Sequence, residues 1–504
     1  MMNGKGFDNE KYLKEQSREI LERIEKFQGK LYLEFGGKLL YDYHAARVLP
    51  GYDPNVKIKL LKQLKDKIDI LLCIYAGDIE KGHIRGDFGI TYDVDALKLI
   101  DGLREHGLDI LGVVITRFDN QSQAVNFKKR LENHNINVYL HSATKGYPTD
   151  IETIVSEEGY GKNTYIETRN PVVVVTGPGP GSGKLATCLS QLYHDYRRGV
   201  HSGYAKFETF PVWNIPLKHP VNLSYEAATA DINDSNVIDP FHLNAYGIST
   251  VNYNRDVEIF PVLKRILEKI TNGKMPYASP TDMGVNRIGA AITDDSIVQE
   301  AARQELIRRY FRYRHESILG VGDKNIVDKM ILLMEECGTK VEDRAVVKPA
   351  RESASEKRKE GREVPKISCG AALQLKDGSI ITGKNSCLMS AASSLVLNSI
   401  KQMAGIPDRI HLLSPHVIEN IARMKKDVLN LKSEILDLAE TLIVLSFSAA
   451  TNPAAELAME KLGELSSCDA HFTHIPVPGD ETGLRNLRIY ITTDGYFPSR
   501  NLVL

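Results

Sequence analysis

Residues 171–196 constrain the fold more strongly than any other part of the sequence. Pro171 is followed by four valines, then by a segment rich in glycine and proline, and then by a helical pattern from Leu185 to Tyr196. Four consecutive β-branched residues are typical of a strand buried on both faces, as in a parallel sheet covered by helices. The pattern therefore predicts a buried strand, a tight loop and a helix in that order, which is the unit from which α/β folds are built.

The loop in this unit has the composition of a phosphate-binding loop. A loop that precedes a helix can point several backbone amides at one anion, and the positive end of the helix dipole adds to the attraction. Glycines let the backbone approach a ligand, and a lysine neutralises phosphate charge. We expect a P-loop-like site whose contacts come from Gly177, Gly179, Gly181, Ser182, Gly183 and Lys184.

Two positions depart from the usual P-loop pattern. Pro178 stands where that pattern has a glycine, and Leu185 stands where a Ser or Thr normally follows the lysine to bind magnesium. Thr187, three residues after the lysine, is the candidate to hold the metal instead. The alternative interpretation is a tight strand-to-helix turn that binds no ligand.

Further apolar runs indicate that this strand belongs to a larger, mostly parallel sheet. The runs alternate with helical patterns, as expected when helices cover both faces of a sheet. The predicted strands are 30–35, 68–75, 108–116, 137–140 and 171–175, and the predicted helices among them are 9–27, 93–106, 121–134 and 185–196.

The length of 504 residues suggests about three domains, so the chain is predicted to be multidomain. We assign residues 1–290 to an α/β region that binds phosphate or nucleotide. Residues 291–347 have helical periodicity and are predicted to form a helical segment. Residues 348–365 carry charge runs and no bulky apolar residue before Val364, so a linker or exposed loop is expected there. Residues 366–504 are predicted to form a C-terminal α/β domain.

Carboxylate and amide side chains are concentrated between Asn222 and Asp256. Carboxylates can hold magnesium or act as general acid and base, and an arginine can bind a phosphate. The alternative is structural, because Asn and Asp routinely cap helices and build turns. We predict catalytic roles for Lys184, Asp231, Asp239 and His242, ligand binding by Thr187 and Arg255, and magnesium binding by Thr187, Asp231 and Asp234, with Glu226 as a further carboxylate.

Charge and cysteine usage restrict the partner and the compartment. The 64 basic and 65 acidic residues give a net charge of −1 without a basic stripe, which argues against nucleic acid as the main partner. None of the six cysteines forms a Cys-x-x-Cys pair, which favours reduced thiols in a cytoplasmic protein. The first residues lack the apolar core of a signal peptide, and no apolar stretch is long enough to span a bilayer, so no membrane partner is expected.

Zinc chemistry lacks its ligands in this sequence. His315 and Glu316 begin like the zinc-protease helix motif, but Leu319 occupies the position of the second histidine. The segment from Cys468 to His474 carries ligand-type residues spaced three apart, but it is predicted to be extended, where such side chains face opposite ways. We therefore expect no zinc cofactor.

Taken as a whole, the chain resembles a family of bacterial proteins of about five hundred residues whose function is unknown. The segments that carry the resemblance are 38–51, 85–93, 173–189, 222–242 and 279–286. Some members of that family have been labelled ATP-dependent peptidases. The loop at Gly177–Lys184 fits the first part of that label, and the incomplete motif at His315 does not fit the second. The resemblance therefore implies a shared architecture and not an assigned activity.

A more local resemblance concerns residues 369–404. CGAALQLKDGSIITGKNS predicts a hairpin, a helix follows over 388–403, and together they resemble the opening of the cytidine-deaminase-like fold. In that family a Cys or His followed by Ala-Glu at the helix start supplies a zinc ligand and the proton shuttle. Here the helix begins with Met389-Ser-Ala-Ala392, so the resemblance implies the fold without zinc chemistry.

These patterns favour a cytoplasmic enzyme that binds a nucleotide or another phosphorylated small molecule. ATP or GTP with magnesium would be the ligand, and phosphoryl transfer or ligation would be the reaction class. A competing interpretation is a non-catalytic protein that senses a phosphorylated metabolite, which the missing Ser or Thr after Lys184 favours. A third interpretation is a homo-oligomer formed through the helical segment 291–347.

Overall fold

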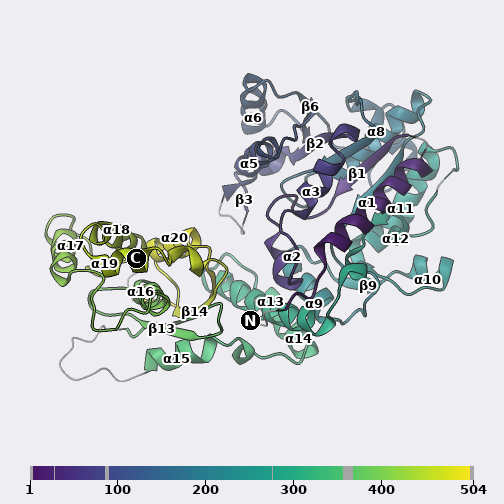
Figure 1. Cartoon of the computed structure of the whole chain (residues 1–504). Coiled ribbons are helices and arrows are strands. Elements are labelled where there is room, and N and C mark those ends of the chain that lie inside the picture. Colours follow the sequence, from purple (N-terminus) through teal and green to yellow (C-terminus); the bar gives the residue numbers. More distant parts are fainter. Residues whose placement is uncertain (1–3, 28, 86–89, 275, 356–366, 500–504) are drawn as a thin grey trace. The chain divides into compact units, whose positions relative to one another are not determined.

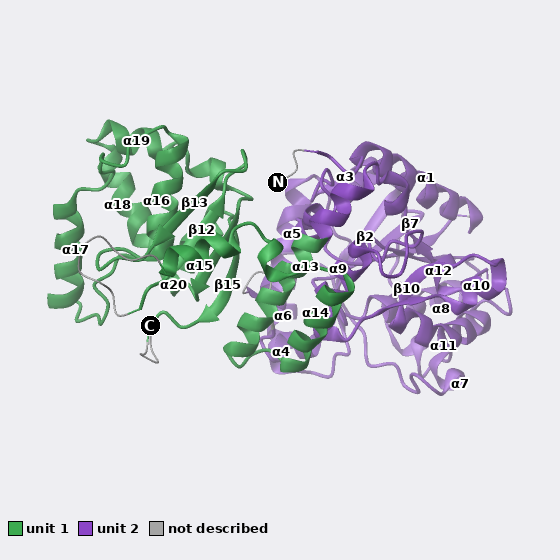
Figure 2. Ribbon diagram, turned by 90° about the horizontal axis from the view of Figure 1, so that it is seen from below, with its two compact units in different colours: residues 1–3, 303–504 green, residues 4–302 purple. Residues whose placement is uncertain are grey.

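The computed structural model describes residues 4–27, 29–85, 90–274, 276–355 and 367–499. The chain divides into two compact units, which Figure 2 shows in different colours. One unit comprises Gly4–Ala302, and the other comprises Arg303–Leu504 with Met1–Asn3. Each unit has a sheet and a hydrophobic core of its own.

A seven-stranded sheet forms the centre of the first unit (Figure 1). Its order is β11-β8-β1-β7-β2-β5-β6, and every pair of neighbouring strands is parallel. The strands are β1 (Leu31–Phe35), β2 (Ile68–Tyr75), β5 (Gly112–Thr116), β6 (Val138–Leu140), β7 (Val172–Thr176), β8 (Gly203–Phe207) and β11 (Gly284–Val285). The valine run is the central strand β7, and all of its residues are buried. The predicted α/β class with a parallel sheet is therefore confirmed.

Helices and short strands connect and cover this sheet. The helices are α1 (Asn9–Lys26), α2 (Tyr43–Val48), α3 (Val56–Gln63), α4 (Ala76–Glu80), α5 (Tyr92–Glu105), α6 (Ser122–Asn133), α7 (Ile151–Ile154), α8 (Lys184–Arg197), α9 (Pro220–Ala228), α10 (Pro240–Tyr246), α11 (Asn254–Ile270), α12 (Pro280–Met283) and the start of α13 (Asp295–Ile318). The short strands are β3 (Ile84–Arg85), β4 (Ile90–Thr91), β9 (Asn236–Ile238) and β10 (Val251–Tyr253), and the 3-10 helices are η1 (Lys65–Lys67), η2 (Tyr160–Lys162), η3 (Ala230–Ile232) and η4 (Ile288–Ala291).

Successive side chains of each strand point into different helical layers. In β1, Leu31 and Leu33 belong to the core that contains α1 and α3, whereas Tyr32 belongs to the core that contains α8 and α11. Toward the β6 edge, Leu72 and Ile74 of β2 pack with α5 and α6. Two helical layers therefore enclose the sheet, and its carboxyl edge is where the connecting loops meet.

The second unit contains a four-stranded sheet in the order β13-β12-β14-β15. Strand β12 is antiparallel to β13 and β14, and β14 is parallel to β15. The strands are β12 (Gly370–Gln374), β13 (Ile380–Lys384), β14 (Asp469–His474) and β15 (Tyr490–Tyr496). The helices are the rest of α13, α14 (Lys324–Glu336), η5 (Val341–Asp343), α15 (Val347–Ser355), α16 (Ala391–Met403), α17 (Pro415–Asp427), α18 (Leu438–Ala449), α19 (Pro453–Met459), η6 (Leu462–Leu465) and α20 (Pro478–Asn486). The predicted hairpin and the helix after it are present as β12, β13 and α16.

The first part of the predicted linker differs from the exposed loop that we expected. It forms α15, whose residues Val347, Ala350 and Ser353 are buried. A Cβ added to Gly370 of β12 would lie 2.3 Å from the Ala350 carbonyl oxygen, so the two backbones are very close. Packing at that distance needs small side chains, and for this reason the lack of bulky apolar residues did not prevent a helix. The rest of the predicted linker falls within residues 356–366, which lie outside the described residues. The same is true of residues 86–89, in the segment 85–93 that carries the family resemblance.

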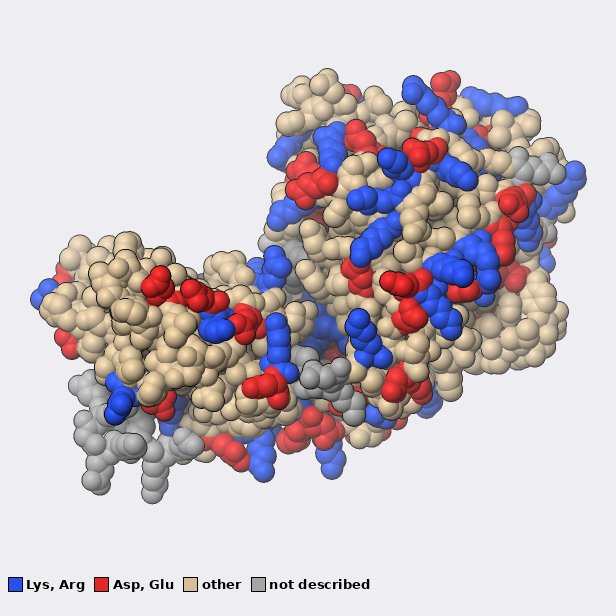
Figure 3. Space-filling model, viewed as in Figure 1, with Lys and Arg blue, Asp and Glu red and all other residues tan. Residues whose placement is uncertain are grey.

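The surface carries charges of both signs. Figure 3 shows basic and acidic side chains interspersed over the visible face, as the net charge of −1 leads one to expect. Within the described ranges, no helix is long and apolar enough to cross a membrane. The six cysteines are free, and four of them are buried.

Candidate functional site

The glycine-rich loop follows the carboxyl end of the central strand β7, at the edge where open α/β sheets bind ligands. Gly183 has a φ of +89°, and a Cβ added there would lie 2.7 Å from the Thr116 side chain. A Cβ added to Gly177 would lie 2.5 Å from the Cys73 carbonyl oxygen. The positive φ of Gly183 and the lack of room for a Cβ at Gly177 and Gly183 therefore require glycine. The loop backbone lies directly against the ends of β2 and β5.

The side chain of Lys184 folds back over the loop. Its ammonium donates to the Gly179 carbonyl oxygen at 3.2 Å and to the Ser182 hydroxyl at 3.3 Å. Among the described residues no carboxylate pairs with this ammonium. Both acceptors are neutral, and an anion would form stronger hydrogen bonds with Lys184 than they do.

Arg117, which follows β5, brings a second positive charge to the loop. Its guanidinium donates to the Gly181 carbonyl oxygen at 2.5 Å and lies 3.4 Å from the centre of the Tyr75 ring. Stacking on the aromatic face holds the guanidinium plane in place. Our sequence analysis did not identify Arg117, because the residue is far from the loop in the sequence.

Helix α8 begins at Lys184 without a side-chain cap, and Gly183 occupies the N-cap position in the left-handed conformation. The first amides of a helix have no acceptor within the helix. In the part of the chain that the structure describes, no acceptor is found for the amides of residues 184–186. The positive end of this 14-residue helix is therefore open toward the loop.

Thr187, the predicted metal ligand, points into the core. It is fully buried, and the distance between its hydroxyl and the Cys73 sulfur is 3.4 Å. Burial raises the pKa of the Cys73 thiol to about 12, so the thiol is protonated at neutral pH. The structure thus places Thr187 between α8 and β2 and does not bring it together with Asp231 or Asp234.

A second polar group lies one and two strands away from the loop, at the carboxyl ends of β1 and β8. Glu34 of β1 pairs in register with Val175 of β7 on one side and with Lys206 of β8 on the other. The Lys206 ammonium lies 2.8 Å from Glu208 Oε1 and also forms an ion pair with Asp256 of α11. A half-buried lysine and three carboxylates are therefore gathered beside the start of the phosphate loop.

The protonation of this group is shifted by its surroundings. The pKa of Glu208 is raised to about 7, mainly by burial. The Lys206 ammonium opposes this rise, and the Asp256 carboxylate adds to it. Burial lowers the pKa of Lys206, but the carboxylates of Asp256, Glu208 and Glu34 outweigh it and raise that pKa overall. A carboxyl that titrates near neutral pH beside a permanently charged lysine is suited to general acid–base chemistry.

Asp239, predicted as catalytic, caps a helix. It is fully buried, and its Oδ1 accepts from the amides of Phe241 and His242 at 3.0 Å each. Its Oδ2 accepts from the Thr281 hydroxyl at 2.6 Å and from the Thr281 amide at 3.2 Å. All of these partners belong to α10 and α12, so the carboxylate joins two helices.

The remaining residues predicted from 222–256 are dispersed. Arg255 and the buried Asp234 form an ion pair with a 2.8 Å contact, and burial raises the pKa of Asp234. Nδ1 of His242 lies 2.9 Å from the Ser279 hydroxyl oxygen. Asp231 is exposed in η3, and Glu226 accepts from the Asn236 amide at 3.2 Å. Over the described ranges, no group of three or more His, Cys, Asp or Glu side chains could hold a metal ion.

Comparison with known proteins confirms the resemblance to an uncharacterised bacterial family. The model described as "Domain of unknown function DUF1846, N-terminal" matches residues 5–338, and the model described as "Domain of unknown function DUF1846, C-terminal" matches residues 342–503. A UPF0371 protein of Clostridium botulinum (strain Alaska E43 / Type E3) is 56% identical over 497 residues, which cover 99% of both chains. A UPF0371 protein of Clostridium tetani (strain Massachusetts / E88) is 56% identical over 499 residues, again with 99% of both chains covered.

Proposed function

This chain belongs to the DUF1846 family, whose domains have no assigned function, and from the geometry of its own site we propose that it binds a small phosphorylated ligand at Gly177–Lys184. The observation that carries the proposal is the meeting of the open amino end of α8 with the side chains of Lys184 and Arg117 at one edge of the sheet. Backbone amides, a helix dipole and two cations are the groups that attract phosphate in proteins.

We further propose ATP or GTP as the ligand class and phosphoryl transfer or ligation as the reaction. Such reactions depend mainly on positioning and on electrostatic stabilisation. Lys184 and Arg117 would stabilise negative charge on the transferred group. Glu208 would exchange a proton with the acceptor, because its pKa of about 7 allows both protonation states near neutral pH.

Magnesium usually accompanies these nucleotides, but the described residues do not offer a protein-built site for it. The predicted ligand Thr187 is buried against Cys73, and no cluster of three metal-ligating side chains is found in the described ranges. Protein-bound magnesium often uses only one or two carboxylates together with phosphate oxygens and water. The proposal therefore assigns no step to a protein-held metal.

The binding proposal is tested by isothermal titration of the full-length chain with ATP, GTP and pyrophosphate. We expect Lys184→Ala to weaken binding of the preferred ligand at least tenfold, because it removes the cation at the helix start. Lys98→Ala, on the exposed face of α5, is the matched control and should bind like the wild type. Equal affinity in wild type and Lys184→Ala would show that the loop is not the site.

A non-catalytic sensor of a phosphorylated metabolite is the second candidate. Leu185 in place of the usual Ser or Thr favours it, since that hydroxyl normally holds magnesium during turnover. Release of phosphate from ATP or GTP by the wild-type chain would favour the enzyme, whereas saturable binding without consumption would favour the sensor.

The cytoplasmic location, the homo-oligomeric state and the lack of a nucleic-acid or membrane partner remain predictions. Light scattering of the purified chain measures its mass in solution and tests the second of these directly.

A further inference from the structure

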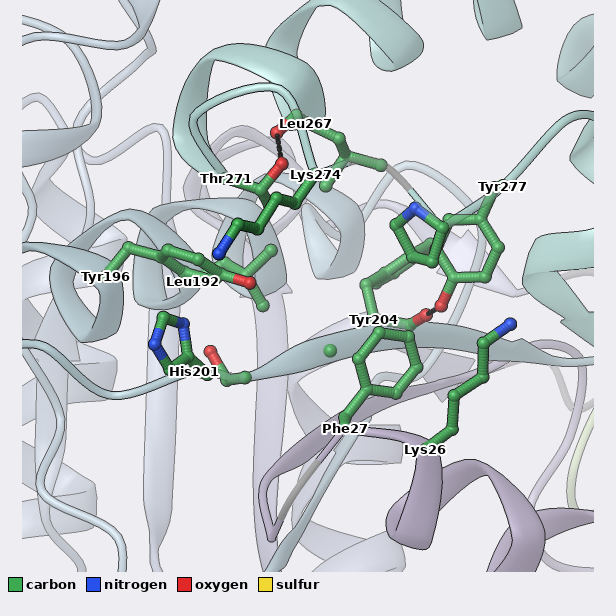
Figure 4. A pocket seen from close by; sticks show the side chains of 13 residues that line it. Lys26, Phe27, Leu192, Tyr196, His201, Tyr204, Leu267, Thr271, Lys274 and Tyr277 are labelled. Carbon is green, nitrogen blue, oxygen red and sulfur yellow. Dashed lines mark hydrogen bonds between the residues drawn. The ribbon is translucent and has the colours of Figure 1, made fainter.

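A pocket of about 270 Å³, shown in Figure 4, opens in the first unit. It lies at the opposite end of the sheet from the phosphate loop. It lies where β8 begins at Gly203, whereas the loop follows the carboxyl end of β7. Leu192 and Tyr196 of α8 line the pocket, and Lys184 begins the same helix. At 1.5 Å per residue, roughly 12–18 Å of helix separates the two places, so the pocket is a separate site.

Aromatic rings form the walls of this pocket. Figure 4 shows Phe27, Tyr196 and Tyr277 around the cavity, and the ring centres of Phe27 and Tyr277 are 6.1 Å apart. The Tyr277 hydroxyl donates to the Tyr204 carbonyl oxygen, which fixes that ring. A Cβ added to Gly203 would lie 2.2 Å from the Phe27 ring, so the ring lies against bare backbone. These contacts hold flat apolar surfaces in place, as a planar ligand requires.

The polar groups of the pocket are cationic or neutral. Lys26, Lys274 and His201 line it, and the described lining residues include no Asp or Glu. The two lysines come from different segments, the end of α1 and the turn after α11, as Figure 4 shows. Among the described residues neither ammonium has a carboxylate partner, and the Lys26 ammonium lies 5.9 Å from the centre of the Tyr277 ring. The pocket therefore favours a negatively charged occupant.

Ser202 adds a hydrogen-bonding group that the fold leaves unused. Its side chain lines the pocket and is 1% exposed, yet its hydroxyl has no hydrogen-bond partner within the described residues. A buried hydroxyl without a partner is unfavourable and rare in folded proteins. An acceptor oxygen of a bound ligand would satisfy it.

We propose that this pocket binds a small carboxylate that carries one aromatic ring. The ring packs against Phe27 and Tyr277, and the carboxylate accepts from the Ser202 hydroxyl. The ammonium groups of Lys26 and Lys274, which Figure 4 shows on opposite sides of the pocket, add positive potential to it without both contacting the carboxylate. A cavity of about 150 Å³ accommodates benzene, so about 270 Å³ accommodates one ring with a carboxylate. The proposal is independent of the phosphate site, because it uses no residue of the loop.

The test is titration of the full-length chain with benzoate, followed by ligand-detected NMR. Three probes each lack one feature of benzoate or more. Cyclohexanecarboxylate lacks the aromatic ring, benzamide lacks the negative charge, and inorganic phosphate lacks both the aromatic ring and the carboxylate. We expect saturable binding of benzoate and at least fivefold weaker binding of the other three. Ser202→Ala should weaken benzoate about tenfold without lowering the unfolding temperature, because the hydroxyl it removes has no partner in the fold.

Two further variants separate this site from others. The double variant Lys26→Ala/Lys274→Ala should abolish measurable benzoate binding. Lys184→Ala should leave benzoate binding unchanged, whatever its effect on phosphate binding. The proposal is overturned if benzoate does not saturate, if phosphate binds as well as benzoate, or if Ser202→Ala and the double lysine variant both bind like the wild type.

Discussion

The Glu208 carboxyl is buried beside a lysine and a second carboxylate, and these neighbours act on its pKa in opposite directions. Burial disfavours the charged form and has the largest effect, the Lys206 ammonium favours it, and Asp256 disfavours it again. The result is a pKa of about 7 against an ordinary value of 4.5. Over the range between these values the folded chain binds a proton that the unfolded chain has released.

Stability should therefore depend on pH through this one group. Its contribution to the free energy of unfolding is fully present below about pH 4.5 and is lost as the pH rises through about 7, because the folded-state pKa is the higher one. Glu208→Gln has no such proton, so the difference in unfolding free energy between wild type and variant should change by about 3 kcal/mol across that range. Urea unfolding of both proteins from pH 4.5 to 8 measures it, and parallel stability curves would contradict the assignment.

Residues of the site could be predicted from the sequence where their chemical role requires them to be neighbours in the chain. Gly183 and Lys184 were identified because a phosphate loop needs them next to each other in the sequence. Arg117, Lys206 and Glu208 were not, since only the strand order brings the ends of β5 and β8 to the edge where β7 ends. One local signal was available: Lys206 and Glu208 are charged residues at alternate positions in and just after a buried strand. Charges in such a strand need partners or a function.

Elements were predicted well where one physical cause dominates. Continuous apolar runs gave five of the seven parallel strands, and helix periodicity gave α1, α5, α6 and α8, because burial on two faces or on one face fixes these patterns. The strands β8 and β11 at the other edge of the sheet were not predicted. Helix α15 was missed, since its burial depends on the close approach of Gly370 of β12. The acidic stretch 222–256 was interpreted as catalytic, although capping was the alternative, and the choice depends on where α10 and α12 meet.

Asp239 tests that choice, because it connects α10 and α12 through four hydrogen bonds. Asp239→Ala should lower the free energy of unfolding by about 3 kcal/mol, since buried donors lose a charged acceptor. The exposed Asp231→Ala is the control and should change it by less than about 0.5 kcal/mol. Chemical denaturation measures both, and unchanged stability of Asp239→Ala together with lost activity would favour the catalytic role instead.

At the scale of the molecule, each unit has hydrophobic clusters of its own among the described residues. The clusters built on the seven-stranded sheet contain only residues of Gly4–Ala302, and the clusters built on β12 and β14 contain only residues of Arg303–Leu504. Cooperative opening of the backbone follows such cores. A ligand that binds one unit should therefore protect that unit's amides without stabilising the other core directly.

Hydrogen exchange with and without pyrophosphate tests this consequence in the full-length chain. We expect slower exchange in residues 177–187 and in the adjoining ends of β2 and β5, because the ligand is proposed to bind the open amides there and the loop packs on those strand ends. Exchange in β12 and β15 should be unchanged, since these strands belong to the other core. The same experiment with Lys184→Ala is the control and should show much weaker protection at a pyrophosphate concentration close to the Kd of the wild type. Protection that is equally large in both sheets would mean that the ligand acts on the chain as one cooperative body, and protection of β12 and β15 alone would place the anion site in the second unit.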